Sequence, residues 1–104
     1  MDILEDKKGE NIVLVDVHEF SSFTDYFVFV TGTSDRMLDA LAKAVSEGID
    51  QQYDINSKIE GSSQTGWIVV DIGDTVVHLL TQQQRDYYRI EELWSQGKTL
   101  LRLQ

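Results

Sequence analysis

A glycine-led turn offers the first residues in this sequence that could bind a reacting ligand. The turn Gly32-Thr-Ser34 follows an apolar run, and a helical pattern begins immediately afterwards at Asp35-Arg36. A turn of this kind can direct backbone N–H groups toward an anion such as phosphate. A hydroxyl at Thr33 or Ser34 can equally serve only as the cap of the helix. The turn alone leaves both interpretations open.

Nucleotidyl transfer is the reaction that such a turn would serve, but its metal ligands are incomplete. In some transferases the next strand also carries two carboxylates, and these hold two metal ions. Here Asp54-Ile-Asn56 has an amide in the second position. Asp71 and Asp74 flank a turn, and their spacing does not direct both at one point along a strand. His18 and His78 lack further ligands at metal-binding spacing. We therefore expect no catalytic residue, no bound metal and no cofactor.

Composition limits the class of protein. The 104 residues suit one domain, spanning 1–104, and the absence of cysteine excludes disulfides and thiolate metal sites. Eighteen acids against nine Lys and Arg give a formal charge of −9. Direct binding to DNA or RNA phosphates is therefore not expected, whereas a basic protein partner would be attracted. No apolar run reaches the roughly 20 residues of a membrane span, and the N-terminus lacks a signal-peptide pattern. These features indicate a soluble cytoplasmic protein.

A β-hairpin is predicted between Trp67 and Leu80, around the pair Gly73-Asp74. Glycine in the first position suits a two-residue type II′ turn. The predicted cross-strand pairs are Ile68–Leu79, Val70–Val77 and Ile72–Thr75. Their face is almost wholly apolar, so we assign it to the core. The other face mixes aliphatic side chains with an aromatic, an acid and an imidazole: Trp67, Val69, Asp71, Val76, His78 and Leu80. We expect a binding site on that second face.

The remaining segments indicate strands alternating with helices. In chain order we predict a short helix over 2–8, strands over 12–17 and 26–31, a helix over 35–51, an edge strand over 55–60, a flexible loop over 61–66, the hairpin and a helix from Gln82. The tail from Gln96 fits a turn, a loosely docked segment or a frayed end. This order favours an α/β (α+β) fold, with a mixed sheet of about five strands packed with helices.

Aromatic residues near the second hairpin face have two interpretations each. Trp67 at the start of a strand is most simply a core residue, yet its place beside Leu80 on the mixed face also fits a binding anchor. Tyr87 and Tyr88 point about 100° apart on a helix, so one can pack inward while the other faces out. Trp94 completes an apolar stripe with Tyr87, and we interpret it as structural.

Two motifs occur in a fixed order along the chain. The first is SSFTDYF over 21–27, continuing into GTSDR over 32–36; the second is WIVVDIGDTVVH over 67–78, followed by RDYYRIEELW over 85–94. Together they closely resemble the ribosomal silencing factor family, also called Iojap-related proteins, from Lys7 onward. The N-terminal helix is shorter than is typical of that family, and the tail is not part of its pattern.

The resemblance implies a nucleotidyltransferase-like fold without transferase activity, which agrees with an amide at Asn56. It also implies binding to the large ribosomal subunit through its fourteenth protein, at the subunit interface. Occupying that surface would block joining of the small subunit and reduce translation when nutrients are short. By analogy, the residues that contact the partner are Trp67, Val69, Asp71, Asp74, His78, Leu80 and Tyr88.

Two other classes of function stay open at this point. The first is a nucleotidyltransferase-like enzyme or a phosphate-binding protein that uses Gly32–Arg36. The second is a homodimeric assembly module without a ribosomal role. A homodimer of the free protein is also expected under the ribosomal interpretation, because a surface meant for a partner leaves apolar area to cover.

Overall fold

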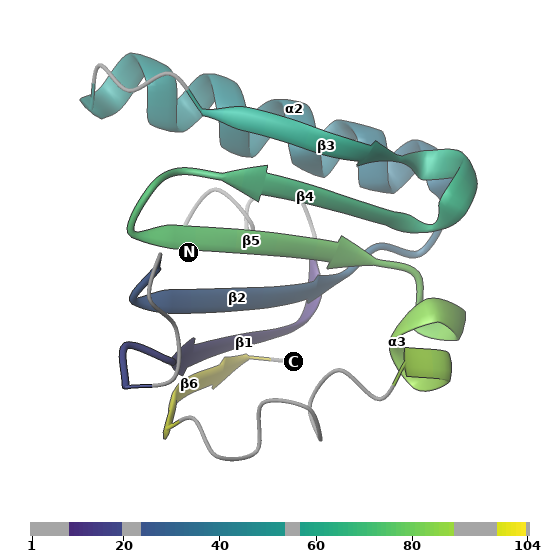
Figure 1. The fold of residues 1–104 in the computed structure, drawn as a ribbon. Coiled ribbons are helices and arrows are strands. Elements are labelled where there is room, and N and C mark those ends of the chain that lie inside the picture. The colour runs from purple at the N-terminus through teal and green to yellow at the C-terminus, as the bar shows by residue number, and fades with distance from the viewer. Residues whose placement is uncertain (1–8, 20–23, 54–56, 89–97, 104) are drawn as a thin grey trace.

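The computed structural model describes residues 9–19, 24–53, 57–88 and 98–103 as one mixed β-sheet with helices against it (Figure 1). In these residues the sheet has six strands, in the order β3-β4-β5-β2-β1-β6. The strands are β1 (Glu10–Asp16), β2 (Tyr26–Thr31), β3 (Lys58–Ser62), β4 (Trp67–Asp71), β5 (Thr75–Leu80) and β6 (Lys98–Leu103). The helices are α2 (Asp35–Tyr53), the 3₁₀ helix η1 (Ser63–Thr65) and α3 (Gln82–Tyr88). The predicted mixed sheet is confirmed, with six strands instead of about five.

The β4–β5 hairpin has the register predicted from its sequence. Its ladder includes the pairs Ile68–Leu79 and Val70–Val77. The Ile72 N–H donates to the Thr75 carbonyl at 2.9 Å, which closes the turn. Gly73 has φ of +107°, a conformation that glycine adopts without steric cost. Because side chains alternate along each strand, this register fixes which hairpin residues face α2.

The side of the sheet toward α2 forms the larger hydrophobic core. α2 begins at Asp35, and Ser34 Oγ accepts a hydrogen bond from the Met37 N–H at 3.1 Å, as an N-cap does. Its buried side chains are Leu38, Leu41, Ala42 and Val45 from α2, Ile12 from β1, Val28 and Val30 from β2, and Ile68, Val70, Val77 and Leu79 from the hairpin. The helix predicted from Asp35 is therefore confirmed, as is the assignment of the apolar hairpin face to the core.

The side of the sheet away from α2 carries a second buried cluster. Its members are Val13, Val15 and Val17 from β1 and the residue after it, Phe27 and Phe29 from β2, and Val76 and Leu80 from β5. Trp67 and Val69 of β4 pack against it and are only partly buried. Two apolar sides explain why β1 and β2 are continuous apolar runs in the sequence, without polar alternation.

The segment 61–66 is not the flexible loop predicted from its Gly and Ser content. β3 continues through Gly61 to Ser62, and η1 follows directly. Gly61 has φ of +85°, and a Cβ there would lie 2.5 Å from the carbonyl oxygen of Trp67. The glycine at position 61 therefore allows β3 to lie close to β4, and it does not form a mobile loop. The predicted place of β3 at the sheet edge is confirmed.

The C-terminal tail is the additional strand. β6 pairs antiparallel with β1, and its register includes Leu101 opposite Leu14. The partner strand lies at the other end of the chain, so no turn joins the two strands. The local sequence therefore contains no signal of this pairing. The helix predicted over 2–8 and Trp94 lie outside the described residues. Tyr87, which was predicted to share an apolar stripe with Trp94, is 76% exposed, so its place on a buried stripe is wrong.

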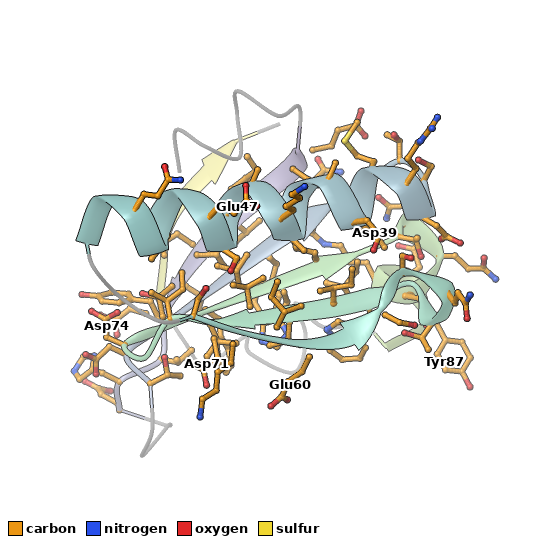
Figure 2. All side chains as sticks on the ribbon, turned by 90° about the horizontal axis from the view of Figure 1, so that it is seen from above. Asp39, Glu47, Glu60, Asp71, Asp74 and Tyr87 are labelled. Carbon is orange, nitrogen blue, oxygen red and sulfur yellow. The ribbon has the colours of Figure 1, made fainter. Side chains whose placement is uncertain are left out.

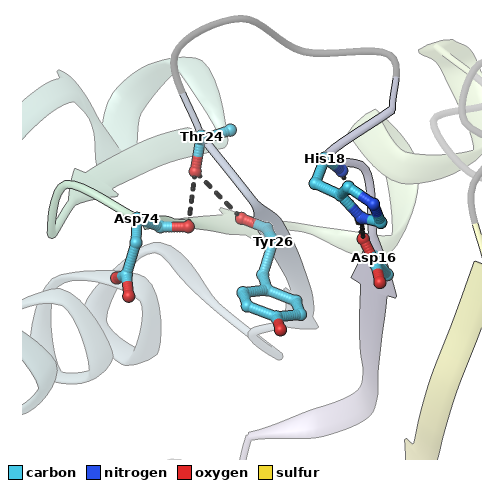
Figure 3. A network of polar contacts seen from close by, with 5 residues as sticks. All are labelled: Asp16, His18, Thr24, Tyr26 and Asp74. Carbon is cyan, nitrogen blue, oxygen red and sulfur yellow. Dashed lines mark hydrogen bonds and ion pairs between the residues drawn. The ribbon is translucent and has the colours of Figure 1, made fainter.

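The hairpin turn is attached to the start of β2 through one carbonyl group. The Asp74 carbonyl oxygen accepts from Thr24 Oγ1 at 2.8 Å (Figure 3). It also accepts from the backbone N–H groups of Asp25 and Tyr26, at 2.9 and 3.1 Å. Thr24 is buried, and its hydrogen bond to Asp74 is partly buried. Asp74 therefore supports the fold through its backbone carbonyl, although the residue is exposed.

Arg85 connects three parts of the chain from a buried position. Only 4 % of the residue is exposed. Its Nη1 donates to the Asn11 carbonyl and to Thr31 Oγ1, both at 2.8 Å. Asn11 has φ of +48° and lies where the β1–β2 register shifts. The guanidinium thus stabilises this bulge and attaches α3 to the adjoining ends of β1 and β2.

Replacing Arg85 with Gln should lower the free energy of unfolding by about 2–3 kcal/mol, because hydrogen bonds from a charged donor are lost and one acceptor, Thr31 Oγ1, stays buried. Urea unfolding at neutral pH measures this loss. Arg36→Gln, at an exposed position in the first turn of α2, is the matched control and should change stability by less than about 0.5 kcal/mol. Equal unfolding midpoints for the two variants would contradict the role of Arg85.

Candidate functional site

His78 is the centre of an aromatic group on the side of the sheet away from α2. The ladders place it between Val69 of β4 and Phe29 of β2. Its ring stacks on Phe29 with the centroids 5.2 Å apart and the planes at 26°. The edge of Phe27 meets it at 5.0 Å and 86°. These contacts fix the plane of the imidazole.

Trp67 completes the group from the first position of β4. Its indole Nε1–H donates to His78 Nδ1 at 3.2 Å, and the ring centroids are 6.0 Å apart. The residue is half-buried and packs against the second cluster. Core packing and surface contact, the two interpretations left open by the sequence, are therefore compatible for this side chain. Part of the indole supports the sheet, and part stays available at the surface.

The hydrogen bond from Trp67 also determines the protonation of His78. Since Nδ1 accepts, the neutral ring carries its proton on Nε2. Burial lowers the pKa of His78 from 6.5 to about 4, so the ring is neutral at physiological pH. Nε2 is itself buried and has no hydrogen-bond partner among the residues that the structure describes. The exposed His18 is the opposite case, because its hydrogen bond to Asp16 at 2.5 Å raises its pKa.

Acidic residues lie beside the Trp67–His78 pair on the same side of the sheet. Glu60 of β3 is opposite Val69, and Val69 is opposite His78, so the three side chains share one row. Asp71 is on the same side of β4, and Figure 2 shows Glu60 and Asp71 on the side away from α2. We call the surface formed by Glu60, Trp67, Val69, Asp71 and His78 the outer face. It has an aromatic and aliphatic centre with two carboxylates beside it, and the exposed Lys58 lies on the same side, opposite Asp71.

The other predicted contact residues differ in exposure. Leu80 is 0 % exposed, so its side chain supports the sheet from within instead of offering contact surface. Asp71 is half-buried, and its Oδ1 accepts from the Gly73 N–H at 2.9 Å. Asp74 is exposed at the hairpin end (Figure 2). Tyr88 is the last residue of α3, and its side chain lies outside what the structure describes. The structure therefore brings Trp67, Val69, Asp71 and His78 together.

Sequence reasoning missed Glu60 on the outer face and the buried Phe27 and Phe29 that contact His78 beneath it. Glu60 reaches the outer face only because β3 pairs with β4, and the two phenylalanines meet His78 only because β2 runs parallel to β5. Lys58 and Glu60 are charged residues at alternate positions around Ile59. This spacing is the one local signal that could have indicated a strand beside the hairpin with one side facing solvent.

The glycine-led turn lies beside an open pocket at the carboxyl ends of β2 and β5. The pocket has a volume of about 610 Å³ and is lined by Gly32, Thr33, Ser34 and Asp35, with Glu10 and glutamine and threonine side chains opposite. Among its described lining residues there is no Lys or Arg that could neutralise a phosphate. Within the same described ranges, no three acidic or histidine side chains converge as a metal site would require. The Asp54–Asn56 segment lies outside them.

The neutral state of His78 should make the stability of the fold depend on pH. The pKa is lowered in the folded state, so the unfolded chain binds the proton more readily and stability falls as the pH decreases from about 6.5 toward about 4. Relative to His78→Leu, the wild type should lose about 2 kcal/mol between about pH 7.5 and about pH 5.

Urea unfolding of both proteins at the two pH values measures this difference. Relative to a variant at His18, the wild type should lose stability as the pH rises, which is the opposite sign. The raised pKa of His18 contributes stability at low pH, and this contribution is lost as the pH rises through that pKa. An unfolding free energy that changes in parallel for wild type and His78→Leu would contradict a buried neutral imidazole.

Comparisons with known proteins give a consistent result. The family model described as "Ribosomal silencing factor during starvation" matches residues 1–103. The ribosomal silencing factor of Bacillus subtilis is 36% identical over 90 residues, covering 86% of this chain and 76% of the relative. The mouse protein named mitochondrial assembly of ribosomal large subunit protein 1 is 32% identical over 96 residues, covering 89% of this chain and 42% of the relative.

Solved structures agree with this match. A crystal structure from Chromobacterium violaceum superposes with a TM-score of 0.85 at 36% identity, covering 90% of this chain and 78% of the other. One from Bacillus halodurans gives a TM-score of 0.80 at 31% identity, with 96% and 90% covered. Among the described helices, none has the length and apolar character to cross a membrane. The motifs, the sheet and the matched length together show that the chain belongs to the ribosomal silencing factor family.

Proposed function

We propose that this chain, acting as a single domain over residues 1–104, represses translation by docking on the large ribosomal subunit and sterically blocking the small subunit. The contacted protein is the fourteenth protein of the large subunit, and the outer face is the docking surface. The contact residues are Trp67, Val69, Asp71 and His78 from this face, together with Asp74 and Tyr88. The protein acts in the cytoplasm when nutrients are short, and it catalyses no reaction.

The observation that carries this proposal is the family match over residues 1–103, because the family description itself names the silencing of ribosomes during starvation. The mouse relative's name refers to assembly of the mitochondrial ribosomal large subunit. That name supports the large subunit, not the small one, as the partner of the present chain.

The chemistry of the outer face supports a protein partner of basic character. A half-buried aromatic with aliphatic neighbours is typical of a binding anchor. The carboxylates of Glu60 and Asp71, within a chain of formal charge −9, attract a positively charged surface and repel bare nucleic acid. Ribosomal proteins, which lie against RNA, offer surfaces of this sign.

For the free protein we propose a homodimer that covers part of this apolar surface. Two-fold pairing of one face with itself is the commonest arrangement of a homodimer. If the same outer face is used, self-association and ribosome docking would compete, and only the monomer would bind the subunit.

Trp67→Ala should weaken binding to purified large subunits by on the order of 2 kcal/mol, which is about thirtyfold in Kd. The fold should survive, because a half-buried tryptophan costs less on truncation than the roughly 3–5 kcal/mol of a fully buried one. Cosedimentation with large and with small subunits measures binding, and thermal unfolding measures the fold.

Ile59→Ala is the matched control for this experiment. Ile59 is 49% exposed and pairs with Val70, so it lies on the side of β3 toward α2 and should not affect docking. Wild-type protein that sediments with small subunits, or Trp67→Ala protein that melts normally and binds like wild type, would overturn the docking proposal.

A nucleotide-binding function is the alternative that the pocket beside Gly32 keeps open. The acidic Glu10 and Asp35 in its lining should repel a triphosphate. Calorimetric titration with ATP and magnesium should therefore show no binding tighter than roughly 10 μM, about −7 kcal/mol. A tighter complex would favour the enzymatic interpretation instead.

A further inference from the structure

The orientation of the Trp67 indole depends on His78. The indole N–H donates to His78 Nδ1 at 3.2 Å, and the imidazole is held in turn by Phe27 and Phe29. A half-exposed aromatic side chain has several rotamers open to it at the surface. The hydrogen bond favours the one in which Nε1 points at the imidazole, and in that rotamer the residue is half-buried against the second cluster.

Stability alone does not account for an imidazole at this position. Its neighbours Phe27, Phe29 and Val76 form an apolar cluster, and Nε2 is buried without a partner among the described residues. An unpaired buried donor is unfavourable, and an aliphatic side chain of similar volume would fill the space without it. The hydrogen bond to Trp67 is what an imidazole provides here and a leucine does not.

We infer that His78 is a positioning residue of the outer face, which holds the Trp67 indole in the orientation that the docking partner contacts. Because the indole N–H is already used, the surface presented to the partner is apolar ring, with Glu60 and Asp71 beside it. An aliphatic patch, or the stem of a Lys or Arg laid over the ring with its charge toward these carboxylates, fits that chemistry. The identity of the partner rests on the proposed function; the orientation of the indole does not.

Two substitutions separate positioning from a merely structural role. His78→Leu removes the acceptor and fills the space, whereas His78→Gln retains a neutral acceptor in its carboxamide oxygen. The leucine variant should unfold at the wild-type temperature or higher, yet bind purified large subunits about tenfold more weakly, or about 1.4 kcal/mol. The glutamine variant should recover most of the affinity. A leucine variant that binds like wild type, or loses stability in step with affinity, would overturn the inference.

A second measurement tests the indole without any ribosome. In ¹⁵N-labelled protein the Nε1–H resonance of Trp67, assigned by its loss in Trp67→Phe, should exchange slowly with solvent. Exchange should accelerate in His78→Leu and slow again in His78→Gln. Wild-type protein that fails to bind large subunits but shows this pattern would overturn the proposed function and leave the positioning role supported. Equal exchange in wild type and His78→Leu would overturn the positioning role, whatever binds.

Discussion

The parallel pairing of β2 with β5 is the constraint on which the rest of this structure depends. It is the only parallel pair among the described strands, and it joins the N-terminal strands to the hairpin. Parallel neighbours require a long crossover, which here consists of α2, β3 and β4. The crossover places α2 on one side of the sheet, so the other side is free to carry a different surface. The register of this pair also sets Phe29 beside His78 and thereby creates the aromatic group.

Local sequence signals predicted the elements whose determinants are short-range. Gly73 specified the hairpin turn, Ser34 specified the start of α2, and the apolar runs specified β1 and β2. The failures have the opposite cause. β6 depends on the open edge of β1 at the far end of the chain, and Gly61 is required by the backbone of Trp67 on the neighbouring strand. Both are tertiary constraints. From composition alone, the segment that contains Gly61 was wrongly predicted to be a flexible loop.

The candidate site divides in the same way. Alternation along the hairpin was sufficient to place Trp67, Val69, Asp71 and His78 on one side, because side-chain direction in a strand is a local property. Burial was not predictable, since it depends on which neighbour covers each side chain. Leu80 shares the side of Trp67 but is fully buried. Glu60 lies on this surface only because β3 pairs with β4. No residue of the hairpin specifies the register of that pairing.

The sheet presents two places where a ligand could bind, and their polar groups are used differently. At the pocket near Gly32 several hydroxyls already have partners within the fold. Ser34 Oγ caps α2, Thr81 Oγ1 accepts the Gln84 N–H at 3.3 Å, and Thr31 Oγ1 accepts from Arg85. These hydroxyls contribute to the fold at a turn whose sequence also fits ligand binding, which is why function is argued from sites and not from topology.

The outer face shows the reverse use of its groups. Its internal hydrogen bond satisfies the Trp67 N–H, Trp67 is half-buried, and Glu60 is exposed. An apolar ring next to carboxylates offers contact area and charge. The basic nitrogen of His78, Nδ1, already accepts the Trp67 N–H, and Nε2, which carries the proton, is buried. The chemistry of this face therefore suits recognition of a protein surface.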